Sequence, residues 1–119
     1  MRSRHMERDD TIGVAEYAGL IDMETLERVA PILKNVAHPL RLRILDYLEH
    51  SGEPRTVTEI MGAANAAQAI VSQQLRILKD MGVLSAKRSG NYVRYGLADR
   101  SVLHVLECIR SRQEFRTGR

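Results

Sequence analysis

Amide and hydroxyl side chains recur along one side of the stretch 65–81, and such groups can read the edges of nucleic acid bases. Wound as a helix at about 100° per residue, the stretch divides into two faces. The polar face consists of Gln68, Ala69, Ser72, Gln73 and Arg76. Glutamine amides can pair bidentately with adenine, and small side chains let the helix backbone approach DNA. We therefore predict that Gln68, Ala69, Ser72 and Gln73 contact bases in a major groove. An ordinary solvated helix surface is the plainer alternative.

The opposite face of the same stretch is mainly apolar. It is made up of Ile70, Val71, Gln74, Leu75, Ile77, Leu78 and Met81. This spacing predicts a helix that packs one side on a hydrophobic core. Gln74 is the polar exception, and we expect it to be hydrogen-bonded within the packing.

The charges of the chain are unevenly placed, although the net charge is only +3. From Met61 to Ala98 the only acid is Asp80, while the same interval holds Arg76, Lys79, Lys87, Arg88 and Arg94. A basic interval in a near-neutral chain favours a polyanionic partner. We expect these bases to contact DNA phosphates, together with Asn91 and, as a weaker candidate, Arg41. Arg88 or Asn91 is the candidate for the minor groove.

A second, shorter helix is predicted directly before the stretch 65–81. Thr56 and Glu59 have the spacing of a capping box, in which each side chain accepts the other residue's backbone N–H. Asn65 separates the two helices and either takes a left-handed turn or caps the second helix. A short helix, a tight turn and a helix with a groove-compatible face together predict a helix-turn-helix.

Two alternating segments, 84–88 and 92–97, follow the stop at Gly82, with a turn predicted at residues 89–91. This pattern is typical of a β-hairpin. We expect Lys87, Arg88, Asn91 and Arg94 near its tip, as in a basic wing that lies along the DNA backbone or enters the minor groove.

Helices are also predicted on both sides of this unit. Asp22 resembles an N-cap for a helix with an apolar stripe at residues 26–36, in which Pro31 either makes a kink or opens a new helix. A further helix begins at Pro39 and ends near Gly52. Asp99 is expected to cap the last helix, whose apolar residues are Val102, Val105, Leu106 and Ile109.

Length and composition limit the domain organisation and the class of protein. We expect a flexible segment at residues 1–12, whose first five residues could be a cloning remnant, and one domain at 13–116. The single cysteine, Cys108, fits a reducing cytoplasm. No run of about 18 apolar residues is present, so no membrane span is expected. With one Phe, four Tyr and no Trp, the core must be aliphatic.

Three segments of the sequence, in the order in which they occur, resemble the ArsR/SmtB family of winged-helix repressors. The segment 33–45 is similar to the family's opening segment, and 71–78 to the core of its recognition helix. The segments 82–84 and 87–95 are similar to the approach to its wing and to the wing itself. The resemblance covers roughly residues 26–110.

The resemblance implies a mainly α-helical winged helix-turn-helix with a β-hairpin wing, which dimerises through its first and last helices. It implies a homodimer that binds a near-palindromic operator on double-stranded DNA and represses transcription. The expected interface residues are Leu26, Val29, Leu33, Val102, Val105, Leu106 and Ile109.

The sensing sites depart from the family's pattern. Thr56 and Thr58 stand where the thiol-based sensors carry Cys-x-Cys, and hydroxyls are poor ligands for soft ions. Asp99 matches the zinc-type pattern, but Ser101, Arg112 and Phe115 stand where further ligands are expected. We therefore predict no metal at either usual site and no cofactor. Any inducer is then of another kind, and the sequence does not identify it.

Cys108 leaves an alternative open. His104 and Cys108 are four residues apart, so they share one side of a helix. Two such pairs, meeting across a dimer, could bind zinc or form an intersubunit disulfide. The opposing interpretation is a buried cysteine beside a partly exposed histidine.

Two rival functions remain to be weighed against a sequence-specific repressor. A winged helix can also serve as a protein-interaction module, although the lack of acids between Met61 and Ala98 argues against it. An enzyme is not indicated, since the sequence contains no evident Ser/His/Asp set, paired-acid site or glycine-rich phosphate loop.

Overall fold

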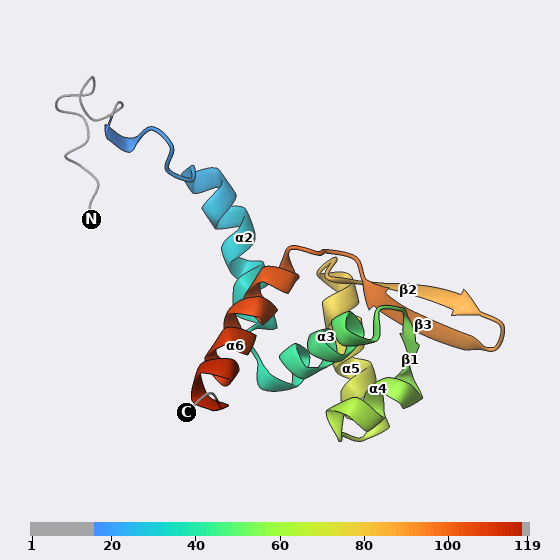
Figure 1. Ribbon diagram of the computed structural model, residues 1–119. Helices are drawn as coiled ribbons and strands as arrows, with labels where there is room; N and C mark the ends of the chain where they lie inside the picture. The colour runs from blue at the N-terminus through green and yellow to red at the C-terminus, as the bar shows by residue number, and fades with distance from the viewer. Residues whose placement is uncertain (1–15, 118–119) are drawn as a thin grey trace. The chain divides into compact units, whose positions relative to one another are not determined.

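A computed structural model describes residues 16–117 of the chain, with side chains as far as Gln113 (Figure 1). The described residues divide into two units, 16–31 and 32–117. The predicted flexible segment 1–12 lies outside the described residues. Among the helices that are described, none is long and apolar enough to cross a membrane.

Helix α2 (Met23–Val36) begins where the sequence predicted it to begin. The Asp22 carboxylate accepts the backbone N–H of Thr25 at 2.7 Å and caps the first turn. Pro31 lies inside this helix, so the alternative in which it opens a new helix is wrong. Val36, the last residue, is buried in the core of residues 32–119.

Helix α3 (Pro39–Ser51) also has the predicted ends. Pro39 lies in its first turn, where the missing N–H costs no hydrogen bond. Gly52 ends it in the left-handed conformation, with a φ of 74°, and its N–H donates to the carbonyl of Leu48.

Helices α4 (Val57–Ala64) and α5 (Gln68–Asp80) form the helix-turn-helix. The predicted capping box is present. The Thr56 hydroxyl accepts the Glu59 N–H at 3.3 Å, and the Glu59 carboxylate accepts the Thr56 N–H at 2.9 Å. Asn65 ends α4 with a φ of 54° and a ψ of 49°, so it takes the left-handed turn. Its N–H donates to the carbonyl of Met61 at 2.8 Å.

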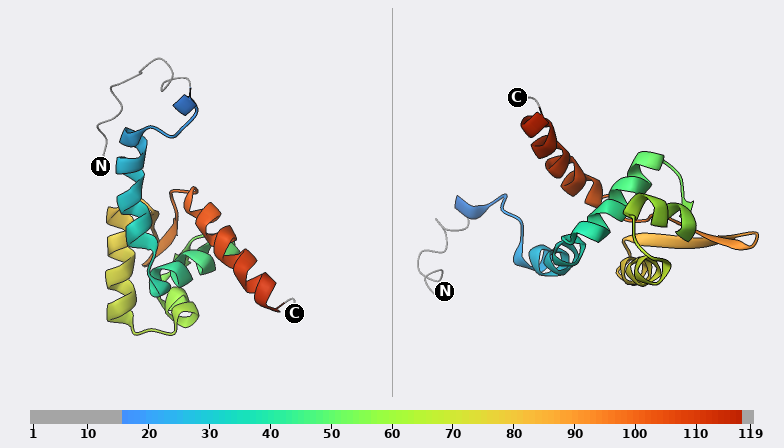
Figure 2. Two further views of the ribbon diagram at one scale, coloured as in Figure 1. Left: turned by 90° about the vertical axis from the view of Figure 1, so that its left-hand side faces the viewer. Right: turned by 90° about the horizontal axis from the view of Figure 1, so that it is seen from below.

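The wing is an antiparallel sheet in the order β1-β3-β2, made of Arg55–Thr56, Tyr92–Leu97 and Leu84–Ser89. Strand β1 was not predicted. The turn has two residues, because Ser89 pairs with Tyr92, and Gly90 supplies the positive φ (65°) that it needs. The β2–β3 ribbon projects beyond helices α3, α4 and α5 (Figures 1 and 2).

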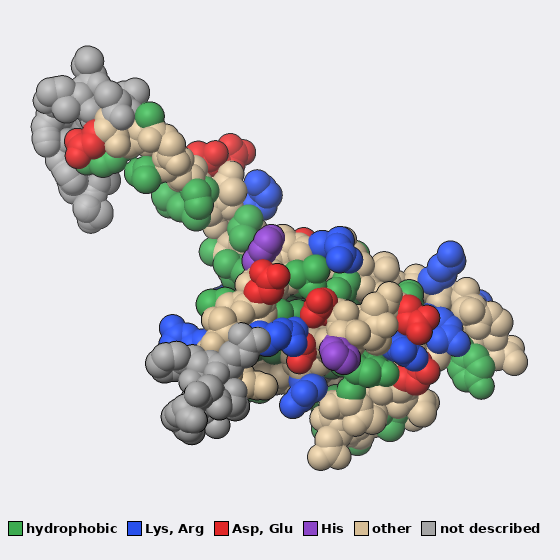
Figure 3. All heavy atoms as spheres, viewed as in Figure 1, with side chains coloured by type: hydrophobic (Ala, Val, Ile, Leu, Met, Phe, Trp, Pro, Cys, Tyr) green, Lys and Arg blue, Asp and Glu red, His purple; other side chains and the backbone are tan. Residues whose placement is uncertain are grey.

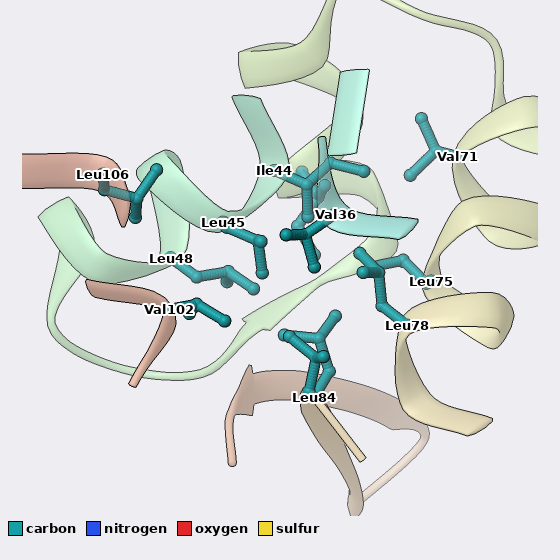
Figure 4. Close-up of a cluster of buried hydrophobic side chains, with 12 residues drawn as sticks. Val36, Ile44, Leu45, Leu48, Val71, Leu75, Leu78, Leu84, Val102 and Leu106 are labelled. Atoms are coloured by element: carbon teal, nitrogen blue, oxygen red, sulfur yellow. The ribbon is translucent and has the colours of Figure 1, made fainter. Parts of the chain in front are cut away.

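The core of residues 32–119 is aliphatic, as expected. Side chains from α3, α5, the base of β2 and α6 (Val102–Thr117) converge in it (Figure 4). Its buried members are Val36, Ile44, Leu45, Leu48, Ile60, Val71, Leu75, Leu78, Val83, Leu84, Val102 and Leu106.

Ile70 departs from the predicted apolar face, since it is 48% exposed. The buried line of α5 runs through Val71, Leu75 and Leu78. Ile70 lies about 100° around the helix from Val71, at the edge of that line.

Candidate nucleic-acid interface

Helix α5 is anchored on one side and open on the other. Val71, Leu75 and Leu78 have no solvent exposure, so this side of the helix lies in the core. The side chains on the open side are all exposed, and they are Gln68, Ala69, Ser72, Gln73 and Arg76. The sequence-predicted base-reading residues therefore share one accessible face.

The beginning of α5 has features that suit a nearby anion. Ala67, at the N-cap, has no side chain that could accept the free backbone N–H groups, and the first turn contains no acid. Unpaired N–H groups at a helix N-terminus favour negative charge. A phosphate group beside this end of α5 would therefore not be repelled by the first turn of the helix.

The wing presents further cations. Lys87, Arg88 and Asn91 are exposed. Consecutive side chains of a strand point to opposite faces, so Lys87 and Arg88 lie on different sides of the ribbon. On the face shown in Figure 3, Lys and Arg side chains lie over the hairpin, and acidic side chains lie near its base.

The position of Arg94 corrects a prediction. Arg94 and its β2 partner Lys87 lie in mid-sheet and not near the tip of the hairpin, and Arg94 also pairs with Thr56 of β1. Its Nη1 lies 3.8 Å from the Glu59 carboxylate. Arg94 therefore links the wing to α4, and its role as a phosphate contact is not supported by the structure.

Glu59 is the centre of this link. Besides the Thr56 N–H, its carboxylate accepts the Thr56 hydroxyl at 3.2 Å and Nη1 of Arg55 at 3.4 Å. The hydrogen bond from the Thr56 backbone is the main reason that the pKa of Glu59 lies below its usual value, with Arg55 and Arg94 adding to the effect. One carboxylate thus joins β1, β3 and the start of α4.

Arg41 also departs from its predicted role. Its Nε donates to Oε1 of Gln74 at 2.6 Å, and its Nη1 donates to the carbonyl of Asn35 at 2.7 Å. The guanidinium is held within the protomer, so a phosphate contact by Arg41 is not supported. Gln74 is hydrogen-bonded within the packing, as predicted.

The predicted dimer-interface residues fall into two groups. Val102 and Leu106 are only 2% and 5% exposed, and they belong to the core of the protomer itself. Their assignment to an interface is wrong, because a partner could bury almost nothing more of them. Apolar surface remains at Leu26, Leu33 and Ile109, which are exposed, and at Val29 and Val105, which are half-buried.

Helix α6 is held to α3 by an ion pair that the sequence did not predict. Nη2 of Arg110 lies 2.7 Å from Oδ1 of Asp46 and 3.1 Å from Oε1 of Glu49. Periodicity could not reveal it, since these residues are more than 60 positions apart.

The sensor residues were predicted with two alternatives. Cys108 is exposed in the single protomer, so it is not buried in the protomer's own core. His104 is also exposed, with Nδ1 3.9 Å from Glu107. The Asp99 carboxylate accepts the N–H and the hydroxyl of Ser101, which lowers the pKa of Asp99. The side chain of Phe115 lies outside the described residues.

The fold and these positions can be compared with known proteins. Residues 38–86 match the family model described as "Bacterial regulatory protein, arsR family". The HTH-type transcriptional repressor SmtB of Mycobacterium tuberculosis is 39% identical over 83 residues, which are 70% of this chain and 60% of SmtB. The HTH-type transcriptional regulator NmtR of the same organism is 34% identical over 87 residues, which cover 73% of this chain and 71% of NmtR.

Solved structures agree with these matches. The antimony-specific transcriptional repressor AntR superposes with a TM-score of 0.75 at 33% identity, covering 84% of this chain and 89% of AntR. A homodimeric winged helix-turn-helix DNA-binding domain from Mycobacterium bovis superposes with a TM-score of 0.65 at 28% identity, covering 86% of this chain and 95% of that domain. The chain thus spans only 60% of the length of SmtB but most of NmtR and AntR. On these grounds the chain belongs to the arsR family of bacterial regulatory proteins, which are transcriptional regulators and not enzymes.

Proposed function

We propose that this protein is a transcriptional repressor that binds a near-palindromic operator as a homodimer. The observation that carries the proposal is the exposed polar face of α5, on a helix whose other side packs into the core through Val71, Leu75 and Leu78 and which lies next to a basic hairpin. The relatives SmtB and AntR are named as repressors, and the M. bovis domain as a homodimer.

Each part of the surface has its own role in this proposal. Sequence is read by Gln68, Ala69, Ser72 and Gln73 in the major groove. Phosphates are contacted by Arg76, Lys79, Lys87 and Arg88, and either Arg88 or Asn91 enters the minor groove. Arg41 and Arg94 are left out, because each is already bonded within the protomer.

The homodimer would bury the apolar surface that one protomer leaves open. Leu26, Val29 and Leu33 from α2 and Val105 and Ile109 from α6 would form the interface. Two copies of α5 would then meet half-sites one helical turn or more apart. The inducer would not be a metal at the usual family sites, because Thr56 and Thr58 offer only hydroxyls there.

Replacing Gln73 and Lys87 by alanine separates base reading from phosphate binding. Gln73→Ala should lower discrimination at one base pair by about 1–3 kcal/mol. Lys87→Ala should weaken binding to all duplexes alike. The measurement is fluorescence anisotropy with a duplex that the wild type selects from a randomised pool, and with single-base variants of that duplex. If Lys87→Ala changed the sequence preference while Gln73→Ala did not, the roles would be reversed.

The exposure of both His104 and Cys108 supports a second candidate, a repressor whose DNA binding responds to oxidant or zinc. Cys108→Ser should then abolish any loss of operator affinity that hydrogen peroxide or zinc causes in the wild type. A wild type whose affinity is the same with and without both reagents would dismiss this candidate and leave the repressor proposal untouched.

A further inference from the structure

A single guanidinium joins the end of α2 to the recognition helix α5. Arg41, in the first turn of α3, donates from Nε to the side-chain amide of Gln74 and from Nη1 to the carbonyl of Asn35. Asn35 is the penultimate residue of α2. Both distances, 2.6 and 2.7 Å, are those of short hydrogen bonds to a charged donor.

The position of Gln74 on α5 makes this bond relevant to DNA. It directly follows the proposed base-reading residue Gln73, but it is half-buried on the side that faces the protein. The apolar contacts of Val71, Leu75 and Leu78 fix how deeply α5 lies in the core, but apolar packing is not directional. A charge-assisted hydrogen bond adds a direction, since it restrains both sliding and rotation of the helix.

We infer that Arg41 and Gln74 are positioning residues, which hold the base-reading face of α5 in a fixed register against the end of α2. This inference rests on the proposed function and deepens it. Since Leu33, two residues before Asn35, belongs to the proposed dimer surface, the same link relates the α5 face of each protomer to that part of the surface. Arg41 then acts on sequence recognition without contacting DNA.

The test compares binding to the duplex that the wild type selects from a randomised pool with binding to an unrelated duplex of equal length. Sequence preference is the dissociation constant for the unrelated duplex divided by the dissociation constant for the selected duplex. Unfolded protein weakens the apparent binding of both duplexes by the same factor, so it does not change this ratio. Arg41→Leu and Gln74→Leu should each lower this ratio about tenfold, because each removes a hydrogen bond to a charged group. The double variant should lower it no further than Arg41→Leu alone, since the Arg41–Gln74 bond is already broken in that variant.

Two further variants separate positioning from charge. Gln74→Glu keeps an acceptor for the Arg41 Nε, so it should retain the wild-type ratio. Arg43→Leu is the matched control, because Arg43 is exposed on the same helix and its side chain forms no hydrogen bond or ion pair within the described residues. It should leave the ratio unchanged. Arg41→Leu should also leave unchanged the slope of affinity against salt concentration.

Several results would overturn the inference. If Arg41→Leu weakened both duplexes alike and reduced the salt slope by about 1, Arg41 would be a phosphate contact. If Gln74→Leu altered preference at one base pair while Arg41→Leu did not, Gln74 would be a base contact. Additive effects in the double variant, or loss of the ratio in Gln74→Glu, would also contradict it. A wild type that binds neither duplex would instead refute the proposed function on which the inference rests.

Discussion

Single side chains decide how the elements of residues 32–119 are held together. Glu59 joins the wing to α4, Arg41 joins α3 to α5, and Arg110 joins α6 to α3. Each of these groups is only partly buried, so none bears the full cost of removing a charge from water. These interactions orient the helices and strands relative to one another, because hydrogen bonds and ion pairs depend on direction and apolar packing does not.

The capping box at the start of α4 should be measurable as stability. Thr56→Ala should lower the free energy of unfolding by about 1 kcal/mol, because the Glu59 N–H loses its acceptor. Urea unfolding at neutral pH measures this change. Thr58→Ala is the control, since Thr58 is exposed in the same turn and its side chain forms no hydrogen bond within the described residues. Equal losses in the two variants would contradict the assigned cap.

Glu59 should also make stability depend on pH. Its pKa is lower in the folded chain than in the unfolded chain, so its contribution is complete above the unfolded value of about 4.3 and is lost as the pH falls through the folded value. Glu59→Gln keeps a capping-box side chain but does not titrate. Its stability should fall less steeply than that of the wild type below about pH 4.3. Parallel acid-unfolding curves for the two proteins would count against this role.

Among the helices and strands, features set by neighbouring residues could be predicted from the sequence, whereas features set by residues far apart in the chain could not. Asp22, Pro39 and Gly52 mark helix ends because capping depends on neighbours within a few residues. Strand β1 was missed because Arg55–Thr56 is too short for an alternating pattern and exists only through its pairing with β3. Arg94 was misplaced for the same reason, since its partners lie on β1 and α4.

The turn of the wing should depend on the conformation of Gly90. Its φ of 65° is strained for an L-residue, so Gly90→Ala should destabilise the fold by about 1–2 kcal/mol. Gly62 is the matched control, because it lies in α4 and an added Cβ would meet no atom within 4 Å. Gly62→Ala should stabilise the fold by about 0.5–1 kcal/mol. Thermal unfolding of both variants measures the difference, and changes of the same sign would argue against this turn.

For the molecule as a whole, the candidate site was predictable in part. The open face of α5 follows from a helical period of 3.6, so its exposed residues could be read from the sequence. The hydrogen bonds that withdraw Arg41 from solvent depend on Asn35 and Gln74, which the chain brings together only on folding. The burial of Val102 and Leu106 in the protomer could not be predicted either. An apolar stripe of helical period shows that one side of α6 is covered, but it does not show whether the core or a partner covers it.

The exposed apolar surface of α6 should support the homodimer. Ile109→Glu should give monomers, because it places a charge in the proposed interface. Ile70→Glu is the matched control, since Ile70 is 48% exposed, against 46% for Ile109, but lies on α5. It should remain a dimer. Sedimentation velocity distinguishes the two, and a dimeric Ile109→Glu protein would place the interface elsewhere.

In the proposed complex, paired copies of α5 and the wing bind one DNA duplex largely through its phosphates. The most direct test is to titrate the wild-type protein into its selected duplex at 50 and 200 mM salt, with anisotropy for affinity and sedimentation for stoichiometry. If the dimer neutralises about six phosphates, affinity should fall roughly a thousandfold between the two conditions, with two protomers on each duplex. A monomer with no measurable binding at 50 mM salt would contradict the account.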